Sequence, residues 1–348
     1  MTNQLLNVWD YEAAATELLD DGAHGYYAGG AGDEVTLRDN VEGFRRWVLR
    51  PRVLVDIADC STRTTVLGQE IAMPLIVAPV AFQRVAHPDG EIGMATAARD
   101  AGTIMCLSTL ATTSLVEVAA TGAPRWFQLY VFQDEGITRD LVARAKDAGF
   151  RAIVLTVDTP TLGRRERDLR SGFTIPENIA IAELGTGGVT PHGALEMMSR
   201  SVTWRDAERL AGYSELPVLL KGVVTSEDAH LACEHGAAGV VVSNHGGRQL
   251  DGAAATIDSL PEVAAAIDGR IEVLVDGGIR RGADVVKALA LGARAVLAGR
   301  APLWGLVVGG EAGARRVLDL LHDEIRLALQ LSGCASPADV TPAHVARR

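Results

Sequence analysis

The chain has 348 residues, of which 48% are hydrophobic and 22% are charged, and its mean hydropathy is +0.14. This composition is typical of a packed globular protein and excludes a disordered one. The formal net charge of −11 and the pI near 5.2 argue against nucleic acid or an anionic membrane as a partner, because an acidic surface repels both. A small anion remains compatible with this charge if basic side chains gather at one site.

Neither a membrane nor a secreted location is indicated. No segment approaches the roughly 18 to 20 consecutive apolar residues that a membrane span requires, and the acidic N-terminus lacks the basic start and apolar core of a signal peptide. The four cysteines lie far apart without CxxC spacing, which indicates neither a zinc site nor a disulfide framework. We therefore expect a cytoplasmic protein that binds no metal.

Short apolar runs alternate along the chain with longer helical segments. Eight runs are expected to be strands: PLIVAP from Pro74, TIMCLST from Thr103, RWFQLY from Arg125, AIVLTV from Ala152, PVLLKG from Pro217, AGVVVSN from Ala238, EVLVDGG from Glu272 and RAVLAGR from Arg294. Intervening segments such as TRDLVARAKDAG have helical spacing and end on a glycine suited to a left-handed C-cap. Strands that are apolar throughout and alternate with helices form a parallel sheet buried on both faces. Eight such units predict a single-domain α/β protein, a TIM (β/α)₈ barrel over residues 70–335.

Two segments fall outside the eight repeats. Residues 1–60 are expected to form an N-terminal helical extension. Residues 162–216, which include IAELGTGGVTPHGA, separate the fourth strand from the fifth. Because loops of this length are usually functional, we expect a lid over the active site, with a plain surface insertion as the alternative.

The C-terminal strand ends of such a barrel carry the active site, so the polar residues there predict its chemistry. The sixth strand leads into SNHGGRQLD, residues 243–251, in which His245 and Arg248 exceed what a turn requires. The last two strands end in DGGIRRG and AGR, where glycines beside Arg280 and Arg300 predict a phosphate site. Each residue alone has a structural explanation, such as a hydrogen-bonded core histidine, but their shared place at one rim favours a functional site.

Several common catalytic motifs are missing from the chain. It has no HExxH, GxxxxGK[ST] or GxSxG, and no GxGxxG after a strand. Zinc proteases, P-loop NTPases, α/β-hydrolases and Rossmann dehydrogenases are therefore disfavoured.

Five motifs together resemble the family of FMN-dependent 2-hydroxy-acid oxidases and dehydrogenases, which includes glycolate oxidase, lactate oxidase and mandelate dehydrogenase. They are YYAGGAGDE from Tyr26, TVDTPTLGRRERD from Thr156, LLKGV from Leu219, SNHGGRQLD and DGGIRRG. Over its wider length the chain also resembles 4-hydroxymandelate oxidases. The resemblance implies FMN as cofactor, a 2-hydroxy acid as substrate, and a homo-oligomer, either a tetramer or an octamer.

The resemblance also implies the cofactor contacts. The FMN phosphate would lie on Arg280, Gly299 and Arg300, and Asp276 would hold the ribityl chain. Lys221 would lie near N1 of the flavin, where a cation stabilises the reduced form. The remaining cofactor contacts would come from Pro79, Val80, Ala81, Ser108, Gln128, Thr156, Ser243 and Gly277.

Substrate and catalytic roles follow in the same way. The substrate carboxylate would be bound by Arg165 and Arg248, whose planar forks suit a two-oxygen anion, and by Tyr26. His245 would be the base, Asp158 would orient its ring, and Tyr130 would hydrogen-bond the substrate hydroxyl. Whether His245 takes the Cα proton, or the hydroxyl proton while hydride leaves, stays open at this point.

One position predicts the class of substrate. Leu110, in LSTLATTS, stands where glycolate-type members of the family carry a tryptophan, so the pocket should admit a side chain larger than methyl. We expect an aromatic (S)-2-hydroxy acid, mandelate or 4-hydroxymandelate, that is oxidised to the 2-oxo acid.

The loop after the fourth strand is mixed and polar, unlike the apolar anchor of membrane-bound mandelate dehydrogenases, and Ala81 matches the oxidases. Oxygen is therefore the expected electron acceptor, with hydrogen peroxide as product. Three alternatives remain: a soluble dehydrogenase with another acceptor, an FMN-dependent isomerase acting on a diphosphate, and a non-catalytic flavin-binding protein.

Overall fold

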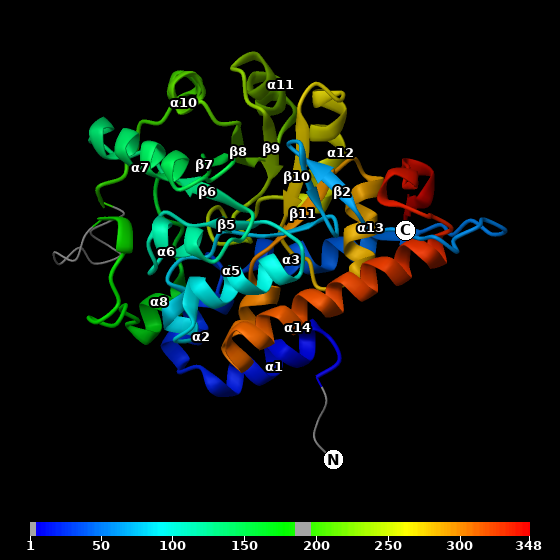
Figure 1. Cartoon of the computed structure of the whole chain (residues 1–348), viewed down its shortest axis with the longest axis horizontal. Helices are drawn as coiled ribbons and strands as arrows, with labels where there is room; N and C mark the ends of the chain where they lie inside the picture. Colours follow the sequence, from blue (N-terminus) through cyan, green and yellow to red (C-terminus); the bar gives the residue numbers. More distant parts are fainter. Residues whose placement is uncertain (1–4, 185–195) are drawn as a thin grey trace.

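The centre of the molecule is a closed barrel of eight parallel strands (Figure 1). The structure is a computed structural model that describes residues 5–184 and 196–348. The barrel strands are β4 (Leu75–Val77), β5 (Met105–Leu107), β6 (Arg125–Leu129), β7 (Ile153–Thr156), β8 (Val218–Val223), β9 (Gly239–Val242), β10 (Glu272–Asp276) and β11 (Ala295–Ala298). They follow one another around the wall in chain order, and β11 pairs with β4 to close it. All eight predicted strands are confirmed, and so is the barrel fold.

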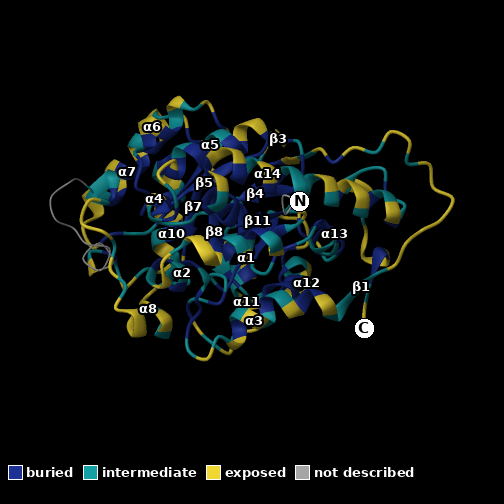
Figure 2. Ribbon diagram, turned by 90° about the horizontal axis from the view of Figure 1, so that it is seen from below, coloured by how far each residue is buried: buried dark blue, intermediate teal, exposed yellow. Residues whose placement is uncertain are grey.

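The strands are apolar throughout because each is buried on both of its faces. In β4, Ile76 belongs to a cluster built from barrel strands and a short hairpin alone, which places this cluster inside the barrel. Its neighbours Leu75 and Val77 belong to the larger cluster that the strands share with the helices. The hairpin of β2 (Thr64–Val66) and β3 (Gln69–Ile71) adds Val66 and Ile71 to the inner cluster. Figure 2 shows buried segments at the centre of the molecule and exposed ones on its outer turns.

Helices cover the outside of the barrel wall. They are α4 (Gln83–Ala86), α5 (Gly90–Asp100), α6 (Leu115–Ala120), α7 (Glu135–Asp147), α10 (Trp204–Ser214), α11 (Ser226–Glu234), α12 (Thr256–Ile267), α13 (Gly282–Ala290) and α14 (Arg300–Ser332). The predicted glycine stops are confirmed after α7 and α11, where Gly149 has φ 74° and Gly236 has φ 76°. Helix α14 bends at Gly309 and Gly310, whose backbone angles are not helical.

The described part of the N-terminal extension, residues 5–60, contains three α-helices and one strand. Helices α1 (Val8–Leu18), α2 (Asp21–Ala28) and α3 (Val35–Glu42) are followed by the 3-10 turn η1 (Gly43–Arg46) and by β1 (Trp47–Leu49). Asn7 caps α1, because its side chain accepts from the backbone N–H groups of Trp9 and Asp10. Helix α1 packs against α14 (Figure 1).

The strand in this extension was not expected from the sequence. β1 pairs antiparallel with β12 (Val345–Arg347) at the other end of the chain, after the 3-10 turns η3 (Pro337–Asp339) and η4 (Pro342–His344). The extension thus contains a short strand besides the helices that the sequence predicts, because a pairing across nearly the whole chain leaves no local signal in three residues.

The segment between β7 and β8 is only partly an insertion. It contains α8 (Glu166–Ser171) and the 3-10 turn η2 (Ala182–Leu184), and residues 185–195 within it lie outside the described residues. Helix α10 packs on β8 and α7, so it is the barrel's own helix between β7 and β8. The predicted boundary at residue 216 is therefore too far along the chain, and the action of this segment as a lid stays a prediction.

Within the described ranges, no helix is long and apolar enough to cross a membrane.

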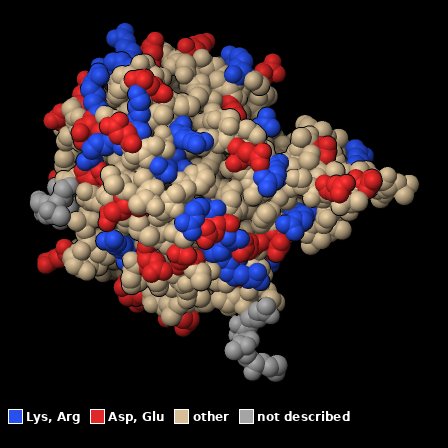
Figure 3. Space-filling model, in the orientation of Figure 1, with Lys and Arg blue, Asp and Glu red and all other residues tan. Residues whose placement is uncertain are grey.

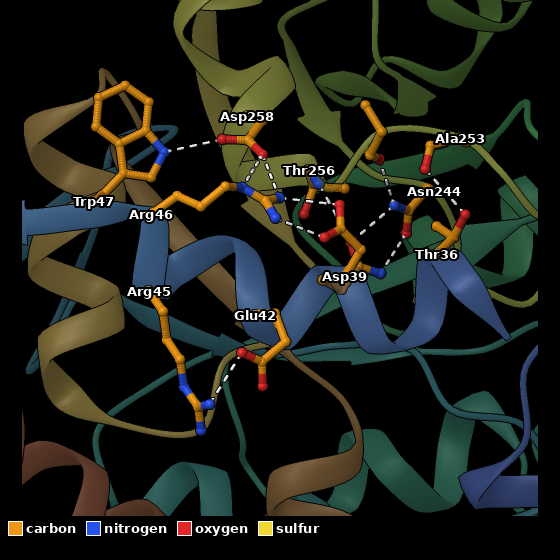
Figure 4. A network of polar contacts seen from close by, with 12 residues as sticks. Thr36, Asp39, Glu42, Arg45, Arg46, Trp47, Asn244, Ala253, Thr256 and Asp258 are labelled. Carbon is orange, nitrogen blue, oxygen red and sulfur yellow. Dashed lines mark hydrogen bonds and ion pairs between the residues drawn. The ribbon is translucent and has the colours of Figure 1, made fainter. Parts of the chain in front are cut away.

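A polar network fastens the extension to the loop after β9 (Figure 4). Asn40 and Asn244 exchange side-chain hydrogen bonds of 2.8 Å in both directions. Arg46 pairs with Asp39 and Asp258, and the indole N–H of Trp47 donates to Asp258 at 3.1 Å. The network therefore fixes the residue immediately before His245.

Candidate active site

A cavity opens at the C-terminal ends of the barrel strands. It holds about 1270 Å³ of empty space, part of which is continuous with solvent. Of the predicted site residues, only Asp158 and Ser243 do not line this cavity. The predicted residues that line it are Tyr26, Pro79, Val80, Ala81, Ser108, Leu110, Gln128, Tyr130, Thr156, Arg165, Lys221, His245, Arg248, Asp276, Gly277, Arg280, Gly299 and Arg300. The sequence motifs thus converge on one cavity, as expected.

His245 and Asp158 form a hydrogen-bonded pair at the wall of the cavity. Nδ1 of His245 lies 2.8 Å from Oδ1 of Asp158. Burial would raise the pKa of Asp158, but the charges of His245 and Lys221 bring it down to about 2. Since Asp158 is ionised, Nδ1 carries the proton and Nε2 has a free lone pair. Burial lowers the pKa of His245 and outweighs the attraction of Asp158, which leaves His245 a neutral base at neutral pH.

The turn after His245 requires its two glycines. Gly246 has φ 65° and Gly247 has φ 76°, a region that favours glycine. A Cβ on Gly247 would lie 2.5 Å from the backbone of Leu37 in the extension, and one on Gly246 would lie 2.9 Å from the guanidinium of Arg300. The backbone of Leu37 therefore excludes a side chain at Gly247, whereas at Gly246 a side chain would be strained by the positive φ and would displace the Arg300 guanidinium.

Buried arginines concentrate positive charge inside this acidic protein. Burial and the neighbouring Arg165 lower the pKa of Arg248 to about 10, and burial with Arg248 and Arg280 lowers that of Arg300 to about 9. Both guanidinium groups remain charged at neutral pH. On the face shown in Figure 3, acidic and basic side chains are interspersed, whereas these arginines gather in the cavity. An anionic ligand would offset the cost of burying these charges.

Backbone carbonyls orient two of these arginines. Arg248 donates through Nη1 to the carbonyls of Tyr26, at 2.6 Å, and Gly29, at 2.9 Å. Arg300 donates to the carbonyls of Tyr27, Gly246 and Gly29 at 2.9 to 3.1 Å. The buried Nε of Arg165 has no hydrogen-bond partner among the described residues, which leaves a donor available for a ligand.

A second polar group lies on the strands at the base of the cavity. The side-chain oxygen of Gln128 accepts from Thr109 N–H at 3.1 Å and from the Ser108 hydroxyl at 3.2 Å, and its Nε2 donates to Thr156 at 3.0 Å. The Gln128 amide is therefore held in one orientation by its neighbours.

Lys221 joins Ser243 and Asp276 beside this group. Its Nζ lies 3.0 Å from the Ser243 hydroxyl and 3.4 Å from Oδ2 of Asp276. Burial opposes the charge of Lys221, but Asp276 and Asp158 raise its pKa, so it stays a cation. The other oxygen of Asp276, Oδ1, is buried without a partner within the described ranges. This orphaned acceptor, with a fixed cation and the arginines, fits a ligand that carries hydroxyl groups and a phosphate, as FMN does.

The arginine at the predicted phosphate end has partners that sequence reasoning missed. Nε of Arg280 lies 3.2 Å from Glu12, and its guanidinium lies 5.4 Å from the ring centre of Trp9. Both partners lie on α1, far from Arg280 along the chain, so the sequence gave no signal that they would contact it. Thr159 and Leu162 also line the cavity; they lie inside TVDTPTLGRRERD, where their closeness to Asp158 was an available signal.

An apolar cluster forms one side of the cavity. Phe82, Leu110, Ile181 and Met198 are buried together, with Tyr26, Ala81 and Tyr130 packed against them. Ile181 and Met198 come from the segment between β7 and α10, so this segment packs against the wall that carries Leu110. The wall near Leu110 is therefore suited to an apolar group.

Comparisons with known proteins agree with this geometry. A family model described as FMN-dependent dehydrogenase matches residues 15–347. An L-lactate oxidase of Nostoc sp. is 50% identical over 351 residues, which cover 96% of either chain. Glycolate oxidase 3 of Arabidopsis thaliana is 48% identical and covers 98% of this chain and 96% of its own.

Solved structures of mandelate oxidase have the same fold. A variant with (S)-mandelic acid has a TM-score of 0.93 and 44% identity, and covers 99% of both chains. Mandelate oxidase with benzoyl-formic acid gives the same three values. The chain therefore belongs to the FMN-dependent dehydrogenase family and is an FMN-dependent enzyme that oxidises 2-hydroxy acids.

Proposed function

We propose that the protein oxidises an aromatic (S)-2-hydroxy acid, mandelate or 4-hydroxymandelate, to the 2-oxo acid, with oxygen as electron acceptor and hydrogen peroxide as product. The observation that carries the substrate class is the wall at Leu110, where Phe82, Ile181 and Met198 are buried together with it. An apolar wall favours an aromatic ring over a small side chain, because the ring buries more apolar surface against it. The likeness to mandelate oxidases supports the same class.

The substrate carboxylate is assigned to Arg165 and Arg248. Arg248 is already held by two carbonyls, so the cost of ordering its side chain does not fall on substrate binding. The guanidinium lies 5.1 Å from the ring centre of Tyr26, which keeps the two groups together on one side of the cavity. These contacts would anchor the acid end and turn the other end toward Leu110.

His245 is assigned as the base and Tyr130 as the hydrogen-bond donor to the substrate hydroxyl. The neutral state of His245 and its bond to Asp158 leave Nε2 free to accept a proton, and Asp158 stabilises the imidazolium that results. Burial raises the pKa of Tyr130 to about 12, so its hydroxyl keeps its proton and donates. The residues alone leave both routes open, removal of the Cα proton or of the hydroxyl proton.

FMN supplies the two-electron acceptor when it is bound. We assign its phosphate to Arg280, Arg300 and the backbone of Gly299, its ribityl chain to the free oxygen of Asp276, and its N1 side to Lys221. The ring would lie against the backbone of Pro79, Val80 and Ala81 and the side chains of Ser108, Gln128 and Thr156, near Gly277. Ser243 would act by holding Lys221 in place.

Oligomeric state and location complete the proposal. The family resemblance supports a homo-oligomer, tetramer or octamer, and the composition supports a cytoplasmic protein. Light scattering of the purified protein and its distribution after cell fractionation test these two points.

A second candidate is oxidation of L-lactate. It is favoured by the 50% identity to an L-lactate oxidase over nearly the whole chain. The two candidates are separated by kcat/KM for (S)-mandelate, (S)-4-hydroxymandelate, L-lactate and glycolate, measured by oxygen uptake with peroxide assayed in parallel. A higher value for either aromatic acid supports the proposal, and a higher value for L-lactate or glycolate overturns its substrate class. Reduction of the flavin without oxygen uptake would instead identify a dehydrogenase with another acceptor.

A further inference from the structure

Thr159 lies next to the catalytic pair and has no role so far. It follows Asp158 in the loop after β7, where it is half-buried and lines the cavity. Its hydroxyl donates to Oδ1 of Asp158 at 3.0 Å and lies 3.4 Å from Nδ1 of His245. The hydroxyl thus approaches both members of the pair.

The hydrogen bonds of Asp158 show what this hydroxyl does. Oδ1 accepts from His245 at 2.8 Å and from Thr159 at 3.0 Å, so the two donors share one oxygen. The buried Oδ2 has no partner among the described residues. A donor on a carboxylate oxygen stabilises its negative charge and weakens it as an acceptor for a second donor. The Thr159 hydroxyl therefore competes with the imidazole for the charge of Asp158.

We propose that Thr159 is a positioning residue that limits the hold of Asp158 on protonated His245, so that His245 stays neutral and able to act as the base at neutral pH. The inference rests on the proposed role of His245. It assigns Thr159 no contact with the reacting atoms, because its hydroxyl acts through Asp158.

The other charged and titratable groups around His245 act on its protonation in opposite directions. Asp158 at the end of β7 favours the imidazolium, whereas Lys221 on β8 and Arg165 in the loop before α8 disfavour it. Tyr130 at the end of β6 faces Asp158. Among these groups, only Asp158 accepts a hydrogen bond from the His245 ring. A change in the acceptor strength of Asp158 therefore changes the pKa of His245 directly.

The test compares Thr159→Val, which keeps the shape and removes the hydroxyl, with Thr159→Ser, which keeps the hydroxyl. Thr161→Val is the matched control, since it removes a hydroxyl from the same loop two residues away. Each FMN-loaded enzyme is mixed anaerobically with the best 2-hydroxy acid of the wild type, and the rate of flavin reduction is followed from pH 5 to 9. FMN content and Tm are measured for each variant, and Thr159→Ala replaces Thr159→Val if the latter does not fold.

In Thr159→Val, the acid limb of the plot of reduction rate against pH should shift to higher pH by about 0.5 to 1 unit. The reason is that Asp158 becomes a stronger acceptor without the hydroxyl and so raises the pKa of His245. The plateau at high pH should stay within a few-fold of the wild type, and the limbs of Thr159→Ser and Thr161→Val should not move. If the acid limb of Thr159→Val lies at the same pH as that of the wild type, the inference is overturned.

A second readout does not depend on turnover. The ring signals of labelled histidine, assigned to His245 with His245→Gln, are titrated by NMR in the FMN-loaded wild type and in Thr159→Val. An upward shift of the His245 titration in the variant supports the inference, and no shift contradicts it. If no 2-hydroxy acid reduces the wild-type flavin, the proposed function fails, while this titration still decides the role of Thr159.

Discussion

The cavity contains one neutral base, His245, beside several side chains that stay positively charged at neutral pH. The low pKa of His245 and the pKa values of about 10 and about 9 for Arg248 and Arg300 share their largest cause, burial, which disfavours every charged form. The outcome differs because an imidazole starts near neutrality and a guanidinium far above it. The same environment thus yields a proton acceptor and an anion site side by side.

The base is tested by His245→Ala. The variant should keep yellow FMN, since His245 contributes no predicted contact to the phosphate or ribityl chain, and should lose the rate of flavin reduction by at least about 10² to 10⁴-fold. Anaerobic stopped-flow absorbance measures this rate, with FMN content and Tm as controls for folding. A normal rate of reduction in this variant would show that another group is the base.

The apolar wall is tested by Leu110→Trp. The larger side chain fills the space assigned to the substrate's phenyl ring, so kcat/KM for (S)-mandelate should fall by about tenfold or more relative to glycolate, as one to three kcal/mol of pocket contact allows. Leu110→Met is the matched control, because it nearly conserves volume. An unchanged ratio of the two kcat/KM values in Leu110→Trp would place the ring elsewhere.

Among the secondary-structure elements, strands buried on both faces were predictable and peripheral ones were not. β4 to β11 lie in apolar runs that alternate with helical segments, because both faces of each strand are buried. β1 and β12 have three residues each and find each other across almost the full length of the chain. The site followed the same rule: residues at strand ends were predictable, whereas Glu12 and Trp9 reach Arg280 only through the packing of α1.

The attachment of the N-terminal extension is tested by Asn40→Ala. Asn40 is buried, and its loss removes the reciprocal bonds to Asn244 and the acceptor for Thr256 N–H. The free energy of unfolding should fall by about 1 to 3 kcal/mol, the cost of leaving buried polar groups without partners. Urea denaturation measures the change, with Asn178→Ala, at an exposed asparagine, as the control. A change below about 0.5 kcal/mol would mean that the extension is held mainly by its other contacts.

Over the whole molecule, the net charge of −11 contrasts with the arginines gathered in the cavity, and this contrast predicts how the cofactor affects stability. Without an anion, Arg280 is buried and Arg248 and Arg300 are half-buried near one another, with Glu12 beside Arg280. FMN should therefore stabilise the fold, by about 2.7 kcal/mol at a concentration of 100 times its Kd.

Calorimetry of the FMN-free protein tests this linkage. Tm should rise with added FMN, rise less with riboflavin, which lacks the phosphate, and rise detectably with inorganic phosphate but not with sodium chloride at equal ionic strength. Equal effects of FMN and riboflavin would contradict the assignment of the phosphate to the arginines.

The most direct measurement is the visible spectrum of the purified yellow protein, recorded without oxygen, then after addition of (S)-mandelate, and then after admission of air. The account predicts that (S)-mandelate bleaches the flavin band, that (R)-mandelate does not, and that air restores the band with formation of hydrogen peroxide. A flavin band that (S)-mandelate leaves unchanged while L-lactate or glycolate bleaches it would contradict the aromatic substrate, and a bleached band that air does not restore would contradict the oxidase.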